Sequence, residues 1–209
     1  MCIMSKVMNM KKKVEKNKKS KENNLLESAL YLFTQDDIHN VTVQQIVERA
    51  GVAKGTFYLY FHDKYEIRDV LIQKEASNLF HKALSQLDEN DIRDFEDSVI
   101  FMINQVLIDL ESQPILLKFI KRNLSWGIFQ THLKGAIDDE ESNLVEDFRH
   151  RALVNGYTIK NPEIILYMII ELTGSACYNS ILYQQPLPIQ DFKPYLFDAI
   201  RSILRNYKN

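Results

Sequence analysis

The 209-residue chain has little glycine, proline and cysteine. Because only six glycines and five prolines interrupt it, long segments remain in which apolar residues recur at three- and four-residue spacing, the pattern of amphipathic helices. We find no convincing alternation of the kind that marks a half-buried strand. With 45% hydrophobic residues, the chain can bury a sizeable core. We therefore expect an all-α globular protein.

Cysteine pairs and long hydrophobic runs are also missing. Cys2 and Cys177 have no cysteine or histidine nearby at ligand spacing, so neither a disulfide framework nor a metal site is predicted. The lysine-rich N-terminus is not followed by an apolar run of signal-peptide length, and the longest apolar stretch, 164–170, is far shorter than a bilayer span. These absences favour a cytoplasmic protein without a membrane partner or a cofactor.

Charge is distributed unevenly along the chain. Residues 1–64 contain 11 Lys and Arg against 7 Asp and Glu, whereas residues 65–209 contain 15 against 21. This split suggests a polyanion-binding head on an acidic body, although a solvated lysine-rich tail could produce most of it. We expect residues 1–20 to form a basic flexible arm, with continuation into the first helix as the alternative. DNA phosphate and plain solvent are equally suitable surroundings for this arm.

The segment that follows the arm reads as a helix-turn-helix. An apolar face predicts a first helix over 24–33, and Thr42 with Gln45 forms a capping box that starts a second helix ending at Ala50. Gly51 suits the left-handed conformation of a tight turn. A short third helix over 54–61 comes next, and a fourth begins at Asp63. Helix, helix, a short glycine-containing turn and a further helix is the plan of this motif.

The third helix separates an inward face from an outward one. At about 100° per residue, Phe57 and Phe61 share one face and should pack against the first two helices. The opposite face has little bulk at its N-terminal end, which suits insertion into a DNA major groove. We expect base contacts from Lys54, Thr56 and Leu59, and phosphate contacts from Tyr58, Tyr60 and Lys64.

At these residues the sequence resembles the tetracycline-repressor (TetR) family of bacterial regulators. The resemblance is carried by "LLESALYLF" and "VTVQQIVERAGVAKGTFYLYFHDKYEI", and it runs from about Leu25 to Ile67. It implies base contacts from Lys54, Gly55 and Thr56. It also implies phosphate contacts from Thr42, Tyr58, Tyr60 and Lys64, and a C-terminal helical domain for ligand binding and dimerisation.

Two positions depart from the family pattern. Ala53 stands where a serine or threonine usually caps the recognition helix, so one backbone amide loses its side-chain partner, at a cost of about 1 kcal/mol. Asp37 stands where a glycine usually ends the first helix. Because aspartate tolerates the left-handed conformation better than most residues, we expect it to adopt that conformation there and the turn to be kept.

The remaining length reads as a helical body, with helices expected over 93–112, 114–130, 132–155, 162–182 and 191–206. The segment 162–183 is apolar nearly all round and has small residues at 174–176, where another helix could approach closely. Ala199, Ile200, Ile203 and Tyr207 share a face of the last helix. We expect these two helices, near 162–183 and 191–206, to form a homodimeric four-helix bundle. Simple closure of the monomer core is the alternative.

A ligand pocket is expected among the preceding helices. Aromatic residues and amides alternate there, which suits an apolar cavity with a few orienting polar groups. The expected lining residues are Phe101, Met102, Gln105, Phe119, Asn123, Trp126 and Phe129. For any single one of them, plain core packing is the more common role. Glu171 and Asn179 on the apolar helix are further possible contacts.

An enzyme finds no positive support in the sequence. The histidines at 39, 62, 81, 132 and 150 show no metal spacing and no accompanying nucleophile signature, and the glycines of "GVAKGT" lack the P-loop spacing. A DNA-binding architectural or scaffold protein without small-molecule control would share the same head, and remains the alternative.

We therefore expect a transcriptional regulator, most simply a repressor, that binds a palindromic operator as a homodimer and is released by a small-molecule effector. Its expected parts are the arm at 1–20, the helix-turn-helix domain at 21–68 and the ligand-binding and dimerisation domain at 69–209.

Overall fold

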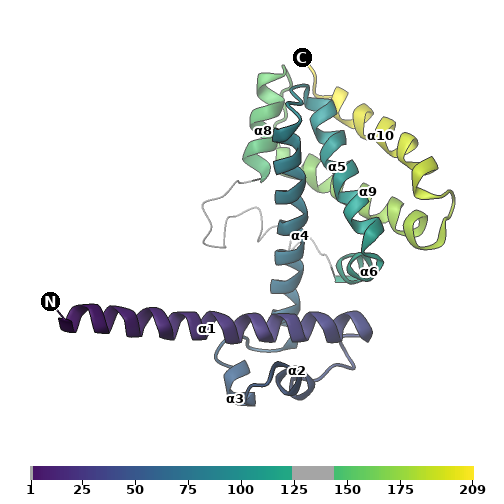
Figure 1. Cartoon of the computed structure of the whole chain (residues 1–209). Helices are drawn as coiled ribbons and strands as arrows, with labels where there is room; N and C mark the ends of the chain where they lie inside the picture. The colour runs from purple at the N-terminus through teal and green to yellow at the C-terminus, as the bar shows by residue number, and fades with distance from the viewer. Residues whose placement is uncertain (1, 124–143) are drawn as a thin grey trace. The chain divides into compact units, whose positions relative to one another are not determined.

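The computed structural model describes residues 2–123 and 144–209, and every named element in these ranges is an α-helix (Figure 1). The elements are α1 (Cys2–Gln35), α2 (Val43–Ala50), α3 (Lys54–Phe57), α4 (Lys64–Glu89), α5 (Phe95–Ser112), α6 (Pro114–Asn123), α8 (Leu144–Val154), α9 (Pro162–Tyr183) and α10 (Ile189–Arg205). The all-α fold class is confirmed. The chain divides into two compact units, Met1–Leu71 and Ile72–Asn209, with the division inside α4.

The first unit is organised around helix α1, which is longer than the sequence pattern suggests. Residues 2–20 were expected to form a flexible arm. They are instead helical and continuous with the rest of α1, which is the alternative given for this segment. The half of α1 after Asn24 supplies the buried side chains Leu25, Ala29 and Phe33. These residues share the core of this unit with Ile46 of α2, because amphipathic spacing places each helix's apolar stripe inward.

The turn after α1 differs from the expectation. The positive-φ non-glycine residues in the described ranges are Asp91 and Gln184, so Asp37 does not take the left-handed conformation. Instead, an oxygen of its side chain accepts a hydrogen bond from the His39 amide at 2.9 Å, and its carbonyl accepts one from Asn40. Aspartate can close a turn through its own carboxylate, which removes the need for glycine geometry.

Local capping fixes α2 and the turn behind it. Thr42 Oγ1 accepts from the Gln45 amide at 3.2 Å, and Gln45 Oε1 accepts from the Thr42 amide at 2.7 Å, which confirms the expected capping box. Gly51 ends the helix at φ 67°, ψ 33°, the left-handed conformation that glycine adopts without a steric cost.

Helices α3 and α4 start differently. Ala53 has the extended conformation of an N-cap residue but supplies no side-chain hydrogen bond, as expected from its methyl group. Asp63 caps α4 by accepting from the amides of Tyr65 at 2.8 Å and Glu66 at 2.9 Å. The hydrogen bond from the Glu66 amide lowers the pKa of Asp63, because it stabilises the ionised carboxylate.

The second unit packs its helices around α9. This helix contacts α5, α6, α8 and α10, and it contributes Ile165, Leu166, Ile169 and Cys177 to the hydrophobic core. By length and composition α9 could also cross a membrane, so the expectation that the apolar stretch is too short does not hold for the whole helix. About a third of this apolar window is buried in the second unit, where α9 contacts four other helices, and one helix of this kind is weak evidence for a membrane span.

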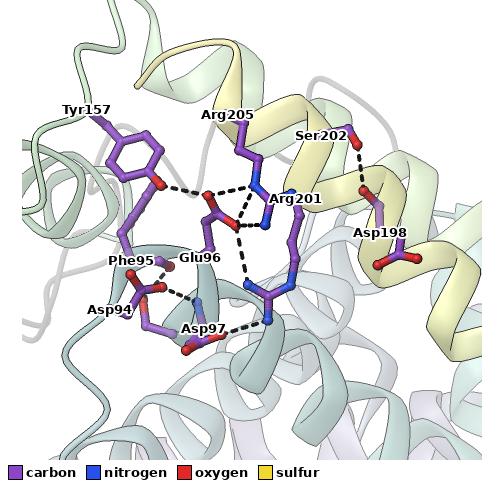
Figure 2. A network of polar contacts seen from close by, with 10 residues as sticks. Asp94, Phe95, Glu96, Asp97, Tyr157, Asp198, Arg201, Ser202 and Arg205 are labelled. Carbon is purple, nitrogen blue, oxygen red and sulfur yellow. Dashed lines mark hydrogen bonds and ion pairs between the residues drawn. The ribbon is translucent and has the colours of Figure 1, made fainter. Parts of the chain in front are cut away.

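A polar cluster built on Glu96 joins α5 to α10 and to the segment after α8 (Figure 2). Tyr157 donates its hydroxyl to Glu96 Oε1 at 2.8 Å, and Arg205 Nε lies 3.0 and 3.1 Å from the two carboxylate oxygens. Arg201 Nη1 adds a contact of 3.3 Å to Oε2 and pairs through Nη2 with Asp97 at 2.6 Å. The carboxylate is buried and fully partnered, so breaking the cluster would leave buried polar groups unpaired.

The same cluster sets two pKa values. Burial of Glu96 acts to raise its pKa, but the hydrogen bonds from Arg205, Tyr157 and Arg201 outweigh burial, and the net pKa is lowered. Burial and the bond to Glu96 raise the pKa of Tyr157 to about 12. Glu96 is therefore ionised and Tyr157 protonated near neutral pH.

Replacement of Glu96 tests how much this cluster contributes to the stability of the fold. Glu96→Gln should lower the free energy of unfolding near neutral pH by about 1.5 to 3 kcal/mol, because hydrogen bonds to a charged acceptor are lost. Since the folded-state pKa is below the ordinary value of 4.5, the contribution is complete above that pH and shrinks as the pH falls below it. Urea unfolding of both proteins across this pH range measures the difference. The exposed Asp91, changed to Asn, is the matched control and should have little effect. If the difference in unfolding free energy between the wild type and Glu96→Gln does not change with pH, Glu96 is not the ionised centre of this cluster.

A capping side chain introduced at position 53 tests whether α3 lacks an N-cap hydrogen bond. Ala53→Thr should stabilise the chain by about 0.5 to 1 kcal/mol, because the backbone at position 53 already has N-cap geometry and gains a hydroxyl acceptor. Ala53→Val has the same shape without the hydroxyl and is the control. The measurement is the shift of the urea midpoint of each variant. Equal midpoints for Thr and Val would contradict a missing cap.

Candidate nucleic-acid interface and internal cavity

Helix α3 presents an exposed face opposite two buried phenylalanines. Phe57 and Phe61 are 0% and 4% exposed, and their ring centroids lie 5.7 Å apart, so the predicted inward face is confirmed. Tyr58 is 55% exposed and Leu59 is 78% exposed. Both side chains are therefore accessible on the face opposite the phenylalanines.

The N-terminal end of this face is small and basic. Lys54 and Gly55 are exposed, and a β-carbon added to Gly55 would meet no atom within 4 Å. The α-helix ends at Phe57, earlier than expected. Phe61 N still donates to the Phe57 carbonyl at 3.0 Å, so the chain keeps turning in a helical sense through the tyrosines. Lys54, Gly55, Tyr58 and Leu59 therefore form one open surface, called here the reading face.

Three of the expected DNA contacts already have partners within the first unit. Thr42 donates its hydroxyl to Gln45 Oε1 at 2.9 Å, and Tyr60 donates its hydroxyl to the Lys18 carbonyl of α1 at 3.0 Å. Lys64 Nζ donates to the carbonyls of His39 and Val41, both at 2.9 Å. Thr56 is half-buried. Sequence reasoning missed the partners of Tyr60 and Lys64 because these contacts join residues far apart in the chain.

Lys64 connects the start of α4 to the loop in front of α2. Its two carbonyl acceptors belong to residues 39 and 41, immediately before the Thr42 cap. A lysine ammonium has three N–H donors, so one remains for a further acceptor. The lysine can hold the loop and meet a phosphate at the same time.

The second unit encloses an apolar cavity of about 180 Å³. Its walls come from α4, α5, α6, α8 and α9, and nearly all of the lining atoms are apolar. The lining residues are Ala76, Leu79, Phe80, Leu84, Phe95, Ser98, Val99, Met102, Ile103, Val106, Leu110, Leu117, Ile120, Leu144, Asp147, Phe148, Arg151, Leu166, Ile169, Ile170, Glu171, Thr173 and Gly174.

The residues expected to line a ligand pocket coincide with this cavity only in part. Met102 and Glu171 line it, whereas Phe101, Gln105 and Phe119 do not. Asn123 is the last residue of α6, and Trp126 and Phe129 lie outside the described residues. Asn179 is exposed. On α5 the lining face includes the expected Met102 together with Val99 and Val106, and it leaves out Phe101 and Gln105, because each step along a helix turns the side chain by about 100°.

Gly174 has a different surrounding from the one expected. The small residues at 174–176 suggested close approach of another helix, but a β-carbon built on Gly174 meets nothing within 4 Å, and this residue lines the cavity. Within residues 2–123 and 144–209, no group of His, Cys, Asp and Glu could hold a metal ion.

Structures with the same fold belong to bacterial regulators. The chain is similar to the FadR regulator of Bacillus subtilis solved in complex with stearoyl-CoA, with a TM-score of 0.62 at 16% identity over 85% of this chain and 96% of that one. It is also similar to SmeT, the repressor of the Stenotrophomonas maltophilia multidrug efflux pump SmeDEF, with a TM-score of 0.60 at 17% identity over 90% of each chain. At these identities the likeness establishes the fold.

Sequence comparison identifies the first unit. An uncharacterized HTH-type transcriptional regulator of Bacillus subtilis (strain 168), YvdT, is 33% identical over 72 residues, which are 34% of this chain and 35% of that protein. The chain thus matches about a third of the length of this relative. Residues 25–71, which contain the capping box, the Gly51 turn and the reading face, match the family described as "Bacterial regulatory proteins, tetR family". Residues 25–71 thus share the sequence pattern of the tetR family of bacterial regulatory proteins.

Proposed function

We propose that this regulator is a repressor that binds a palindromic DNA operator as a homodimer and leaves it when a small molecule fills the cavity of the second unit. The reading face is the observation that carries the DNA-binding part. It combines a lysine, an unobstructed glycine and an exposed leucine on one side of a helix whose other side is anchored by Phe57 and Phe61. This arrangement lets the helix enter a major groove without disturbing its own packing.

The proposed DNA contacts differ in whether the side chain must first give up a hydrogen bond within the protein. Lys54 is exposed and can donate to base edges, Leu59 can touch a thymine methyl, and Tyr58 can donate to phosphate. Gly55 allows close approach of the backbone, and Thr56 lies beside it. Lys64 can use its third N–H on phosphate. Thr42 and Tyr60 each have a single hydroxyl hydrogen, so a bond to phosphate would replace the bond that the structure contains.

The proposed dimer uses exposed apolar residues of α9 and α10. Ile164 and Met168 are 45% and 48% exposed and lie one turn apart on α9, in line with the exposed Ser175 and Asn179. Tyr195 of α10 is 68% exposed. Two of the residues expected at the interface on α10 differ in burial. Ile200 is buried and helps to close the monomer core, which is the alternative role given above, whereas Ala199 is exposed. A second copy covering this surface would remove these apolar side chains from water.

Helix α4 supplies a route for control by an effector. It is one continuous helix from Lys64 to Glu89, with Lys64 bound to the loop before α2 and with Leu79, Phe80 and Leu84 in the cavity wall. A ligand that moves the wall residues would shift the helix that also positions Lys64. A coupling of about 1 to 3 kcal/mol would suffice for regulation, and operator DNA must weaken ligand binding by the same factor. An architectural DNA-binding protein would have no use for this cavity.

Selection of bound sequences from a random DNA pool tests the operator. The full-length protein should enrich a palindrome whose half-sites are centred about 34 Å apart along the DNA. Lys54→Ala should weaken binding to that site by about 1 to 3 kcal/mol and relax the preference at one base position, because a base-edge donor is lost. Quantitative gel shifts measure both effects, with the exposed Lys160→Ala as the control. Failure to enrich any site would refute the proposed function, and an unchanged preference would remove Lys54 from the interface.

A charge on α9 tests the dimer. Met168→Glu should shift sedimentation of the protein from dimer to monomer, because two copies of the new carboxylate would lie in an apolar contact. Leu153→Glu changes a similarly exposed apolar residue outside the proposed surface and should leave the dimer intact. Wild-type protein that sediments as a monomer at micromolar concentration would contradict this surface as an interface.

A further inference from the structure

Among the described lining residues of the cavity, carboxylates outnumber cationic side chains. Asp147 on α8 and Glu171 on α9 line the cavity, and neither carboxylate has an ion pair among the residues that the structure describes. Arg151 is the one cationic residue in the described lining, and its Nη2 already lies 2.8 Å from Asp88 Oδ1. An anionic ligand would therefore face unpaired carboxylates and would have to compete with Asp88 for the arginine.

A buried hydroxyl on α9 lines the same cavity. Thr173 is 9% exposed and lines the cavity, and its Oγ1 has no hydrogen-bond partner among the described residues. A threonine in a helix commonly bonds a carbonyl one turn earlier, and a buried polar atom without a partner is destabilising. The hydroxyl is thus available to a polar group of a ligand.

Open space adjoins the same part of α9. Gly174 follows Thr173 and is one helical turn from Glu171, and a β-carbon added at Gly174 would meet no atom within 4 Å. On the other walls, the rings of Phe95 and Phe148 lie with their centroids 5.2 Å apart, and Phe80 also lines the cavity. Aromatic faces attract cations and exclude water.

We propose that the cavity selects an apolar amine in its protonated, cationic form. The apolar body would occupy the space between α4, α5 and α9. The ammonium would pair with the carboxylate of Glu171, and Thr173 Oγ1 offers a separate acceptor in the same cavity wall. This inference rests on the proposed effector role of the cavity and specifies the charge of the effector, which neither the fold nor the family determines.

Three probes of equal chain length separate charge from apolarity. They are octylamine, which is protonated near neutral pH, 1-octanol, which is neutral, and octanoate, which is an anion. Calorimetric titration of the full-length protein should give an affinity for octylamine about tenfold higher than for octanol, with octanoate the weakest, because a desolvated cation-carboxylate contact is worth on the order of one such factor. Octanoate that binds as tightly as octylamine would overturn the proposal, as would the failure of all three probes to bind.

Variants of α9 locate the site. Glu171→Gln should remove about tenfold from the affinity for octylamine and leave that for octanol unchanged, since only the charge is lost. Glu163→Gln makes the same change on the same helix outside the cavity wall and should alter neither affinity. Gly174→Leu should weaken all three probes at least tenfold by filling the open space, and its circular dichroism should match that of the wild type. Undiminished octylamine binding by Glu171→Gln would overturn the proposed contact.

Operator binding is measured on the same samples, so the two proposals can fail separately. If the protein shifts its operator but does not prefer octylamine, the charge of the ligand is wrong and DNA binding stands. If octylamine binds through Glu171 but no operator is found, the cation site stands and the proposed function fails.

Discussion

Burial of Phe57 and Phe61 is the constraint on which the reading face depends. Because both rings are packed into the core of the first unit, the helix between them cannot rotate about its axis without exposing a phenylalanine. Tyr58 and Leu59 are thereby held toward solvent, and Gly55 is kept clear of neighbouring atoms. The apolar core thus determines which polar groups can meet a partner, although it makes no contact with the partner itself.

The two units are stabilised by different means. In the first unit, interactions between residues close in sequence fix the helix ends: the capping box at Thr42, the left-handed conformation of Gly51 and the N-cap at Asp63. The second surrounds an apolar helix with amphipathic ones and adds the buried Glu96 cluster, whose partners lie 61 to 109 residues away in sequence. A cavity beside such a core costs packing energy, and that cost can be recovered when a ligand fills the space.

Features governed by local rules could be predicted from the sequence. The capping box, the glycine turn and the missing cap at Ala53 each depend on a few neighbouring residues, and the inward phenylalanines follow from helical spacing. Contacts across the chain could not be predicted. Nothing near Lys64 or Tyr60 in the sequence indicates the carbonyls that they bind. On α5 the sequence placed Met102 in the lining correctly but added Phe101 and Gln105, because apolar residues occur on more than one face of this helix and periodicity does not show which face meets the cavity.

The bond from Tyr60 to the Lys18 carbonyl has a consequence for the basic segment at the N-terminus. It ties the extended part of α1 to the turn that carries the reading face, and Lys16, Lys19 and Lys21 project from a helix instead of a loose chain. Helical lysines lose less backbone entropy when a polyanion neutralises them, since the backbone is already ordered. The positive charges are therefore held in an ordered segment before DNA is met. They can accelerate the first encounter with DNA, and ordering of the segment subtracts little from the free energy of binding.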